Sequence, residues 1–283
     1  MPSFSSYVVG AAVRLHLGPH RDRARRDAET LLLRLLDKNR AWMLAHHDEE
    51  LGYEYAGQYI AMLERRFAGE PMQYILGETE FYRLPFRVSP DVLIPRPETE
   101  HVVEKVLTLA PHFNRPRIVD VGTGSGAIAI ALAHALPDAV VTATDVSTAA
   151  LGVARENAQL NGVAERILFR EGDLLEPVAG ELFDIVVSNP PYVPEADRES
   201  LAVEVRDYEP KQALFAGVDG LDLYRRLIPQ ALAALAPGGY LILEIGFGQE
   251  PPVNALLGEA GFENIEFTAD LQGIPRVAFA RKL

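Results

Sequence analysis

The residues with the clearest chemical arrangement are Asn189, Pro190, Pro191 and Tyr192, which directly follow the apolar run 183–188. Proline fixes φ at about −65° and pushes the preceding residue into an extended conformation, so these prolines hold Asn189 and Tyr192 on a stiff frame. Open α/β sheets bind their ligands at the carboxyl ends of strands. We therefore expect this segment to hold a ligand, although Asn-Pro also begins ordinary turns.

A carboxamide beside a backbone carbonyl favours chemistry on an amino group. The Asn189 side-chain oxygen and the Pro190 carbonyl can each accept one N–H of a substrate NH₂ group, and Tyr192 can stack on a planar substrate. An amide nitrogen is a poor nucleophile because its lone pair is delocalised into the carbonyl. Two acceptors would draw electron density onto that nitrogen and orient it. Methyl transfer could then proceed by positioning and electrostatics, without a metal or a covalent intermediate.

A glycine-rich loop follows an earlier apolar run, 117–121. Glycine permits positive φ and a close approach of backbone to ligand, and the N-terminus of the following helix offers unpaired N–H groups. We expect this loop to bind a cofactor through Asp120, Gly122, Thr123, Gly124, Ser125 and Gly126. By itself such a loop is weak evidence, because nicotinamide and flavin enzymes use a similar one.

Further residues narrow the choice of cofactor. Asp145 ends the next predicted strand about 20 residues past the loop, where a carboxylate binds ribose hydroxyls. Asp173 is placed to accept a hydrogen bond from an adenine amino group, although Gly-Asp is also a simple turn, and Leu174 offers an apolar wall. Asp120 suits a positively charged ligand better than a pyrophosphate. Together with Asn189, these residues fit S-adenosylmethionine, whose ammonium and sulfonium groups are cationic.

Alternating strands and helices must position these residues. We predict strands at about 117–121, 139–144, 166–170, 183–188 and 239–245, and helices near 126–136, 147–160 and 221–235. This alternation is typical of an α/β fold with a doubly wound, mostly parallel sheet. The roughly 30 residues between Asn189 and Val218 form a long connection, and loops of that length are usually functional.

The first part of the chain has a different pattern. Apolar residues recur at helical spacing within 28–36 and 55–67, which predicts a small helical domain. Prolines, Gly77 and alternating apolar residues then predict a hairpin, followed by a helix that begins near Pro97. We divide the chain into a helical substrate-recognition domain (1–75), a hairpin linker (76–97) and a catalytic domain (98–283).

Composition limits the classes of partner and compartment. The net charge is −13, and because residues 1–47 contribute +4, the remainder carries −17. We therefore expect no direct nucleic acid binding, which depends on Lys and Arg at phosphates. The absence of cysteine removes disulfides and thiolate metal ligands, so we expect no metal. No apolar run predicts a membrane span or export signal, so we expect a cytoplasmic location.

Together these residues resemble the protein-glutamine N5-methyltransferases that modify the Gly-Gly-Gln loop of class I peptide chain release factors. The similarity extends over nearly the whole chain. It is carried by "ARRDAETLLL", "RAWMLAH", "VLIPRPETE", "DVGTGSGAIAIALA", "SNPPYV", "EVRDYEPKQALFAGVDGLDLYR" and "DLQGIPRVAFARK". The most specific part is the joint presence of "IPRPETE" and "NPPY", since adenine and guanine amino-group methyltransferases share NPPY alone.

The resemblance implies a class I, Rossmann-like methyltransferase fold, S-adenosylmethionine as methyl donor, and a release factor recognised by the helical domain and hairpin. It places Gly122 to Gly126, Asp145, Asp173 and Leu174 at the cofactor, and Asn189, Pro190, Pro191 and Tyr192 on the glutamine amide. Many relatives have an aromatic residue in place of Leu174, which implies weaker stacking here. Arg96 is a further candidate at the cofactor mouth, and an ion pair with Glu98 or Glu100 explains it equally well.

Three alternatives stay open from the residues alone. Glutamine methylation of a ribosomal protein would use the same core and differ only in the accepting protein. An adenine methyltransferase acting on DNA or RNA would use NPPY equally well but should carry a basic groove or an added target-recognition segment. In a nicotinamide oxidoreductase, Asp120 directly before the glycines would have no clear purpose. In a non-catalytic nucleotide-binding module, Asn189 and Tyr192 would have none.

Overall fold

The structure is a computed structural model that describes residues 2–283 and divides into two compact units. The first, here the helical unit, comprises the chain up to Gly77 together with Leu201–Tyr208. The second, here the sheet unit, comprises Glu78–Ser200 and Glu209–Leu283. The hairpin that we predicted as a linker is thus part of the sheet unit, and a segment from the connection after residue 188 is part of the helical unit.

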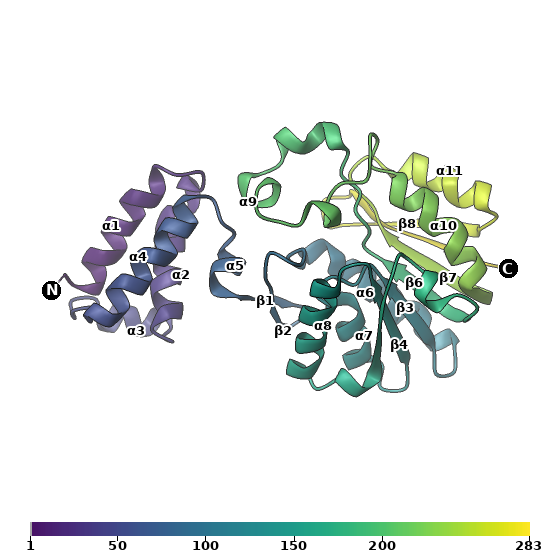
Figure 1. Cartoon of the computed structure of the whole chain (residues 1–283), viewed down its shortest axis with the longest axis horizontal. Helices are drawn as coiled ribbons and strands as arrows, with labels where there is room; N and C mark the ends of the chain where they lie inside the picture. The colour runs from purple at the N-terminus through teal and green to yellow at the C-terminus, as the bar shows by residue number, and fades with distance from the viewer. Residues whose placement is uncertain (1) are drawn as a thin grey trace. The chain divides into compact units, whose positions relative to one another are not determined.

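The sheet unit contains a seven-stranded sheet of order β5-β4-β3-β6-β7-β9-β8 (Figure 1). The strands are β3 Arg117–Val121, β4 Val140–Asp145, β5 Ile167–Glu171, β6 Phe183–Ser188, β7 Leu235–Glu244, β8 Glu263–Ala269 and β9 Pro275–Arg281. Strands β3 to β7 pair in parallel, whereas β9 is antiparallel to both β7 and β8. The prediction of a mostly parallel, doubly wound sheet is confirmed.

Helices cover both faces of this sheet, which explains why its central strands are apolar on both sides. The helices are α6 Glu100–Leu109, α7 Ala127–Ala135, α8 Thr148–Leu160, α10 Asp222–Ala234 and α11 Glu250–Ala260. Alternate residues of one strand enter different cores: Ile118 packs with α6, α7 and α8, and Val119 with α10 and α11. Across residues 2–283, no helix has the length and apolar character needed to span a membrane.

A hairpin precedes the sheet and is fixed to it by an asparagine. Strands β1 (Glu78–Phe81) and β2 (Leu84–Arg87) pair antiparallel around a turn in which Tyr82 and Arg83 have φ of 50° and 61°. Asn157 on α8 donates to the Arg87 carbonyl at 3.0 Å and accepts from the Arg87 N–H at 2.6 Å. This two-way bond makes the hairpin an integral part of the sheet unit.

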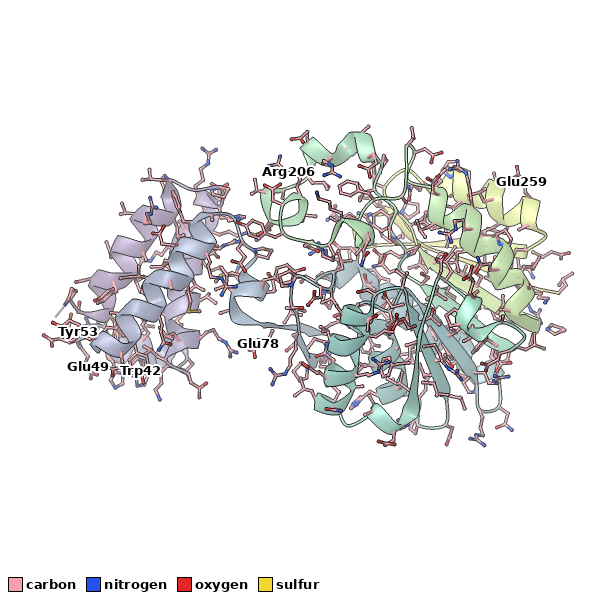
Figure 2. The ribbon with its side chains drawn as sticks, viewed as in Figure 1. Trp42, Glu49, Tyr53, Glu78, Arg206 and Glu259 are labelled. Carbon is pink, nitrogen blue, oxygen red and sulfur yellow. The ribbon has the colours of Figure 1, made fainter. Side chains whose placement is uncertain are left out.

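The helical unit is built on α1 Phe4–His16, α2 Ala24–Leu35, α3 Arg40–Ala45, α4 Tyr53–Phe67 and α5 Met72–Leu76. Leu31, Leu32 and Tyr59 are fully buried in its core. The added segment carries the short helix α9 (Val203–Arg206), on which Arg206 is labelled in Figure 2. The sequence pattern did not reveal that this segment, 201–208, belongs with the helices.

A buried arginine joins the pieces of the helical unit. Arg66, whose side chain is 1% exposed, donates to Asp27 at 2.7 Å, to Glu204 at 3.0 Å and to the Glu70 carbonyl at 2.8 Å. Arginine suits this position because its planar fork can satisfy several acceptors at once. The ion pair with Glu204 therefore fixes segment 201–208 within the helical unit.

Candidate active site

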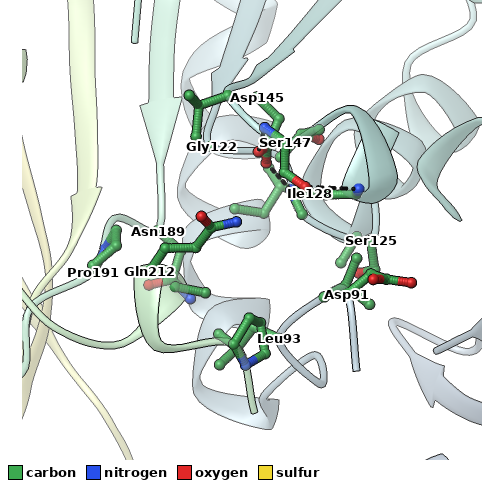
Figure 3. Close-up of a pocket in the computed structure, with 18 of the residues that line it drawn as sticks. Asp91, Leu93, Gly122, Ser125, Ile128, Asp145, Ser147, Asn189, Pro191 and Gln212 are labelled. Carbon is green, nitrogen blue, oxygen red and sulfur yellow. Dashed lines mark hydrogen bonds between the residues drawn. The ribbon is translucent and has the colours of Figure 1, made fainter. Parts of the chain in front are cut away.

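A pocket lies in the sheet unit where β3, β4 and β6 end (Figure 3). We call it the glycine-loop pocket. Its lining includes most of the predicted site residues, namely Gly122, Thr123, Gly124, Ser125, Asp145, Asp173, Leu174, Asn189 and Pro191, together with Arg96. Asp120, Gly126, Pro190 and Tyr192 are not part of the lining. The chain thus gathers residues more than 90 positions apart at one edge of the sheet, as expected for ligand sites in this fold.

Glycine is required at the three positions of the loop for two different physical reasons. Gly122 and Gly124 have φ of 71° and 56°, and a Cβ on either would stand in open space. They leave bare backbone facing the pocket. Gly126 has φ of 83°, and a Cβ there would lie 2.8 Å from Ile130 Cδ1 and 3.2 Å from Ala154 Cβ. Gly126 therefore permits close packing at the start of α7 instead of lining the pocket.

Asp145 is held in place by backbone groups at the end of β4. One carboxylate oxygen accepts the Gly124 N–H at 2.8 Å, and the other accepts the Ser147 N–H at 2.9 Å. Burial raises the pKa of Asp145 in spite of these hydrogen bonds. The Val146 N–H also bonds to this carboxylate, which leaves part of its acceptor capacity for a ligand hydroxyl.

Asp173 and Leu174 line the pocket beyond β5, each with a further constraint. Asp173 forms an ion pair with Arg226 of α10. Leu174 has φ of 49°, which is uncommon for leucine, and its carbonyl accepts the Thr144 hydroxyl at 2.8 Å. The predicted contacts of both residues with an adenine stay predictions.

Asp120 differs from its predicted role. We expected its carboxylate to face a cationic ligand, but it is fully buried beneath the glycine loop. One oxygen accepts the Thr123 hydroxyl at 2.6 Å and the Ala129 N–H at 3.2 Å, while the other has no partner among the described residues. Burial raises the pKa of Asp120 to about 7. Asp120 therefore supports the loop from behind.

The Asn189 side chain is held by a residue that the sequence analysis did not single out. Its amide nitrogen donates to the Thr99 hydroxyl at 3.0 Å, and that hydroxyl donates to Glu244 at 2.5 Å. Thr99 belongs to the quoted "VLIPRPETE" stretch, in which the sequence pattern pointed to Arg96, Pro97 and the two glutamates but not to Thr99. Glu244 is 2% exposed and lies at the end of β7. In the sequence it is marked only as the single acid that ends the apolar run "YLILE".

Tyr192 also differs from expectation. Instead of lining the pocket, its ring is mostly buried, and its hydroxyl donates to the other Glu244 oxygen at 3.2 Å. Its backbone carbonyl accepts from the Gln249 amide at 3.0 Å. A Cβ on Gly220, where φ is 75°, would come within 2.3 Å of the same carbonyl oxygen. These contacts fix the course of the loop that carries Asn189.

Arg96 pairs with an acid other than those expected. Its guanidinium donates to Glu209 at 2.6 Å, and the Glu209 side chain is 1% exposed. Glu100 instead accepts the Tyr82 N–H at 2.9 Å. The pair ties the segment before α6 to the connection after β6, and Arg96 keeps a place in the pocket lining.

Comparison with known proteins agrees with this geometry. Residues 103–206 match the family described as "Methyltransferase small domain", and residues 13–77 match "PrmC N-terminal domain". A release factor glutamine methyltransferase of Moorella thermoacetica is 45% identical over 273 residues, 96% of each chain. One of Koribacter versatilis is 44% identical over 259 residues, 91% of each chain.

The chain belongs to the release factor glutamine methyltransferase family. Among solved structures, a methyltransferase from Pyrococcus furiosus has a TM-score of 0.52 at 19% identity, covering 71% of this chain and 90% of its own. An rRNA methyltransferase of T. Thermophilus in complex with AdoMet and guanosine has a TM-score of 0.54 at 21% identity, covering 73% of this chain and 50% of its own. These likenesses support the methyltransferase fold.

The residues of the pocket fit the methyl donor that this family implies. Bare backbone at Gly122 and Gly124 leaves room for a ligand, and Asp145 is built to accept hydroxyl groups. Asp91, Asp145, Asp173 and Arg96 line the pocket, and with the ion-pair partners Arg226 and Glu209 included, four carboxylates stand against two guanidinium groups. That balance suits a cationic ligand and disfavours a pyrophosphate.

Replacing Asp145 by asparagine is expected to raise the Kd for S-adenosylmethionine by about 10- to 100-fold, because one acceptor becomes a donor facing the ribose hydroxyls and the charge is lost. Titration calorimetry with the purified chain measures this change. The exposed Asp138→Asn is the matched control. An unchanged Kd for Asp145→Asn would remove this residue from the cofactor site.

Proposed function

We propose that the chain transfers a methyl group from S-adenosylmethionine to the side-chain amide nitrogen, N5, of the glutamine in the Gly-Gly-Gln motif of class I peptide chain release factors. The observation that carries this proposal is the fixed amide of Asn189 at the edge of the glycine-loop pocket. Relatives that are named for this activity match the chain over nearly its full length.

The acceptors available beside the pocket suit a primary amide. Because the Asn189 nitrogen is bonded to Thr99, the oxygen is the part of the side chain left to a substrate. Neither this oxygen nor the Pro190 carbonyl accepts a hydrogen bond from any described residue. Two such acceptors on one stiff loop match the two N–H groups of a glutamine side chain.

The reaction then needs positioning more than acid–base strength. S-adenosylmethionine, when bound, supplies an electrophilic methyl carbon on sulfur. The two acceptors orient the amide nitrogen toward that carbon and favour the resonance form with electron density on nitrogen. As the N–C bond forms, the S–C bond breaks. The nitrogen becomes positive and strongly acidic, so its proton passes to Asn189 or to water.

The helical unit offers a surface for recognition of the release factor. A groove between α1 and α2 is lined by the exposed apolar side chains Val9, Val13 and Leu17. Arginines at 21, 25, 26 and 40 also line it, against two acids, Asp22 and Glu29. This combination suits a partner segment with apolar anchors and acidic flanks.

Placing a charge in the groove should weaken recognition of the intact partner without changing the chemistry. We expect Val13→Asp to raise KM for the whole release factor about 10-fold, the effect of losing one contact of ~1.4 kcal/mol. KM for a short Gly-Gly-Gln peptide should not change. Ile60→Asp, at an exposed position on α4 that is not part of the groove, is the control. Equal effects on peptide and protein would contradict recognition by this groove.

The proposed activity is tested with radiolabelled S-adenosylmethionine and four acceptors in parallel: an intact release factor, its Gln→Ala variant in the Gly-Gly-Gln loop, a ribosomal protein fraction, and duplex DNA or RNA. Label on the intact factor alone supports the proposal. Label on the Gln→Ala variant overturns the target residue. Label on the ribosomal fraction or on nucleic acid, with none on the factor, overturns the partner.

A further inference from the structure

We propose that Thr99 and Glu244 are positioning residues that decide which atom of the Asn189 amide faces the substrate. The inference rests on the proposed function, since it concerns how the same site presents a hydrogen-bond acceptor. Thr99 reaches the lining of the glycine-loop pocket beside Asn189, whereas Glu244 is not part of the lining. They act through Asn189, at the far side of its side chain from the reacting amide.

The three side chains form a chain of hydrogen bonds across elements that are distant in sequence. Asn189 Nδ2 lies 3.0 Å from Thr99 Oγ1, which lies 2.5 Å from Glu244 Oε2. Thr99 stands at the start of α6, Asn189 directly after β6, and Glu244 at the end of the neighbouring strand β7. Thr99 is 4% exposed and Glu244 2%, so the bond between these two side chains is shielded from water.

Counting protons fixes the direction of the chain. An ionised carboxylate is only an acceptor, so the single Thr99 hydroxyl proton points to Glu244. The Thr99 oxygen then offers only lone pairs to Asn189, and the amide must turn its NH₂ group toward it. The Asn189 oxygen is left for the substrate. A reversed amide would present N–H groups to the N–H groups of glutamine, which is repulsive.

The behaviour of Thr99 at the helix start supports a role beyond helix formation. Thr99 is the last residue of a 3₁₀ turn, Pro97–Thr99, that continues directly into α6, so it lies inside a helical run and its hydroxyl is not needed as a cap. Here Thr99 has φ of −65° and ψ of −19°, and its side chain makes no capping bond. Its hydroxyl is used entirely between Asn189 and Glu244.

The charge state of Glu244 sets the direction of the whole chain. Four groups act on this carboxyl: the Thr99 and Tyr192 hydroxyls and the Arg276 guanidinium favour its ionised form, whereas Glu98 opposes it. Burial outweighs them and raises the pKa of Glu244 to about 7. The hydroxyl of the fully buried Tyr224 is bonded to the Glu244 backbone carbonyl at 2.8 Å. When Glu244 takes up a proton on Oε2, the oxygen bonded to Thr99, it becomes a donor there and the Thr99 hydroxyl must reverse.

The first test removes the Thr99 hydroxyl. We call the bonded set Asn189, Thr99 and Glu244 the relay. Thr99→Val keeps the shape and removes both bonds, and it should lower kcat for release-factor methylation by about 10- to 100-fold, the effect of losing orientation at the reacting group. KM and the Kd for S-adenosylmethionine should stay within about threefold. Thr99→Ser restores a hydroxyl and should recover most of kcat. Equal activity of Thr99→Val and wild type, or no recovery by Thr99→Ser in a folded protein, overturns the relay.

The second test follows pH. Turnover by the wild type should fall as the pH drops through about 7, because protonated Glu244 no longer fixes the Asn189 oxygen toward the substrate. Asp120 also has a pKa of about 7. The decisive comparison is therefore with Glu244→Gln, which cannot take up this proton. Its turnover should be lower at every pH, and the decrease in turnover that comes from protonation of Glu244 should be absent. A full-amplitude fall in Glu244→Gln overturns the assignment.

A readout that needs no substrate separates the relay from the proposed function. In chain labelled with ¹⁵N-asparagine, the side-chain NH₂ resonances of Asn189, assigned by their loss in Asn189→Ala, should shift with pH near 7 in wild type. They should not shift in Thr99→Val. If wild type labels no release factor while these shifts occur, the proposed substrate is wrong and the relay stands. If the factor is labelled and the resonances ignore both pH and Thr99→Val, the relay is wrong.

Discussion

Asn189→Ala is expected to lower turnover about 10³-fold, or about 4 kcal/mol in the activation free energy, which is the scale of removing a preorganised hydrogen-bonding group. The truncated side chain cannot accept a substrate N–H, and one acceptor, the Pro190 carbonyl, remains. Single-turnover assays with S-adenosylmethionine and a release factor measure the loss. The Kd for S-adenosylmethionine should stay within about threefold, since the glycine loop and Asp145 are unchanged.

Two variants show whether this effect belongs to the amide. Asn189→Asp keeps the shape but has no N–H for Thr99, and it should be nearly as impaired as the alanine variant. Asn254→Ala, on the exposed side of α11, should have wild-type turnover. A Kd for S-adenosylmethionine that rises as steeply as turnover falls would mean that Asn189 supports the pocket and does not clamp the substrate.

Arg66→Met is expected to destabilise the helical unit by about 3–5 kcal/mol, because removal of one partner leaves a buried carboxylate uncompensated. The Asp27 side chain is only 7% exposed and makes the shortest of the arginine's contacts, at 2.7 Å. Trp42, the single tryptophan of the chain, lies in α3 of the helical unit. Its fluorescence during urea unfolding therefore reports this unit separately, and the midpoint should fall markedly.

The effect of Arg66→Met on stability is compared with that of a surface variant and of a double variant. Arg25→Met breaks an exposed pair with Glu29 on α2 and should cost at most about 0.5 kcal/mol. Adding Asp27→Asn to Arg66→Met removes the unpaired charge and should recover part of the loss. A midpoint for Arg66→Met equal to that of Arg25→Met would show that the buried cluster contributes little to stability.

Much of the sheet could be predicted because its signals are local. The apolar runs of β3 and β6, and the glycine loop after β3, have patterns that belong to a parallel sheet with ligands at one edge. The last part of the sheet was missed. Strand β8 shows no fully buried face, and α11 begins with two prolines at 251 and 252 that resemble a loop.

Some residues of the candidate site could likewise be predicted from the sequence, and others could not. Residues that line the pocket lie beside recognisable turns, so Asp145 and Asn189 could be found from their neighbours in sequence. Thr99 and Glu244 acquire their roles only from contact, since 145 positions separate them. The full burial of Asp120 could not be predicted from its place beside the glycines, because it depends on the residues that pack around the loop.

The placement of residues 201–208 has a consequence for how the protein is made. Ribosomes deliver the N-terminal part first, and domains usually fold as they emerge. The helical unit cannot be completed in that order, because Arg66 must wait for Glu204, which is synthesised 138 residues later. Its final form therefore depends on translation of most of the sheet unit, and a chain cut after Gly77 would leave this arginine with Asp27 as its only carboxylate partner in the helical unit.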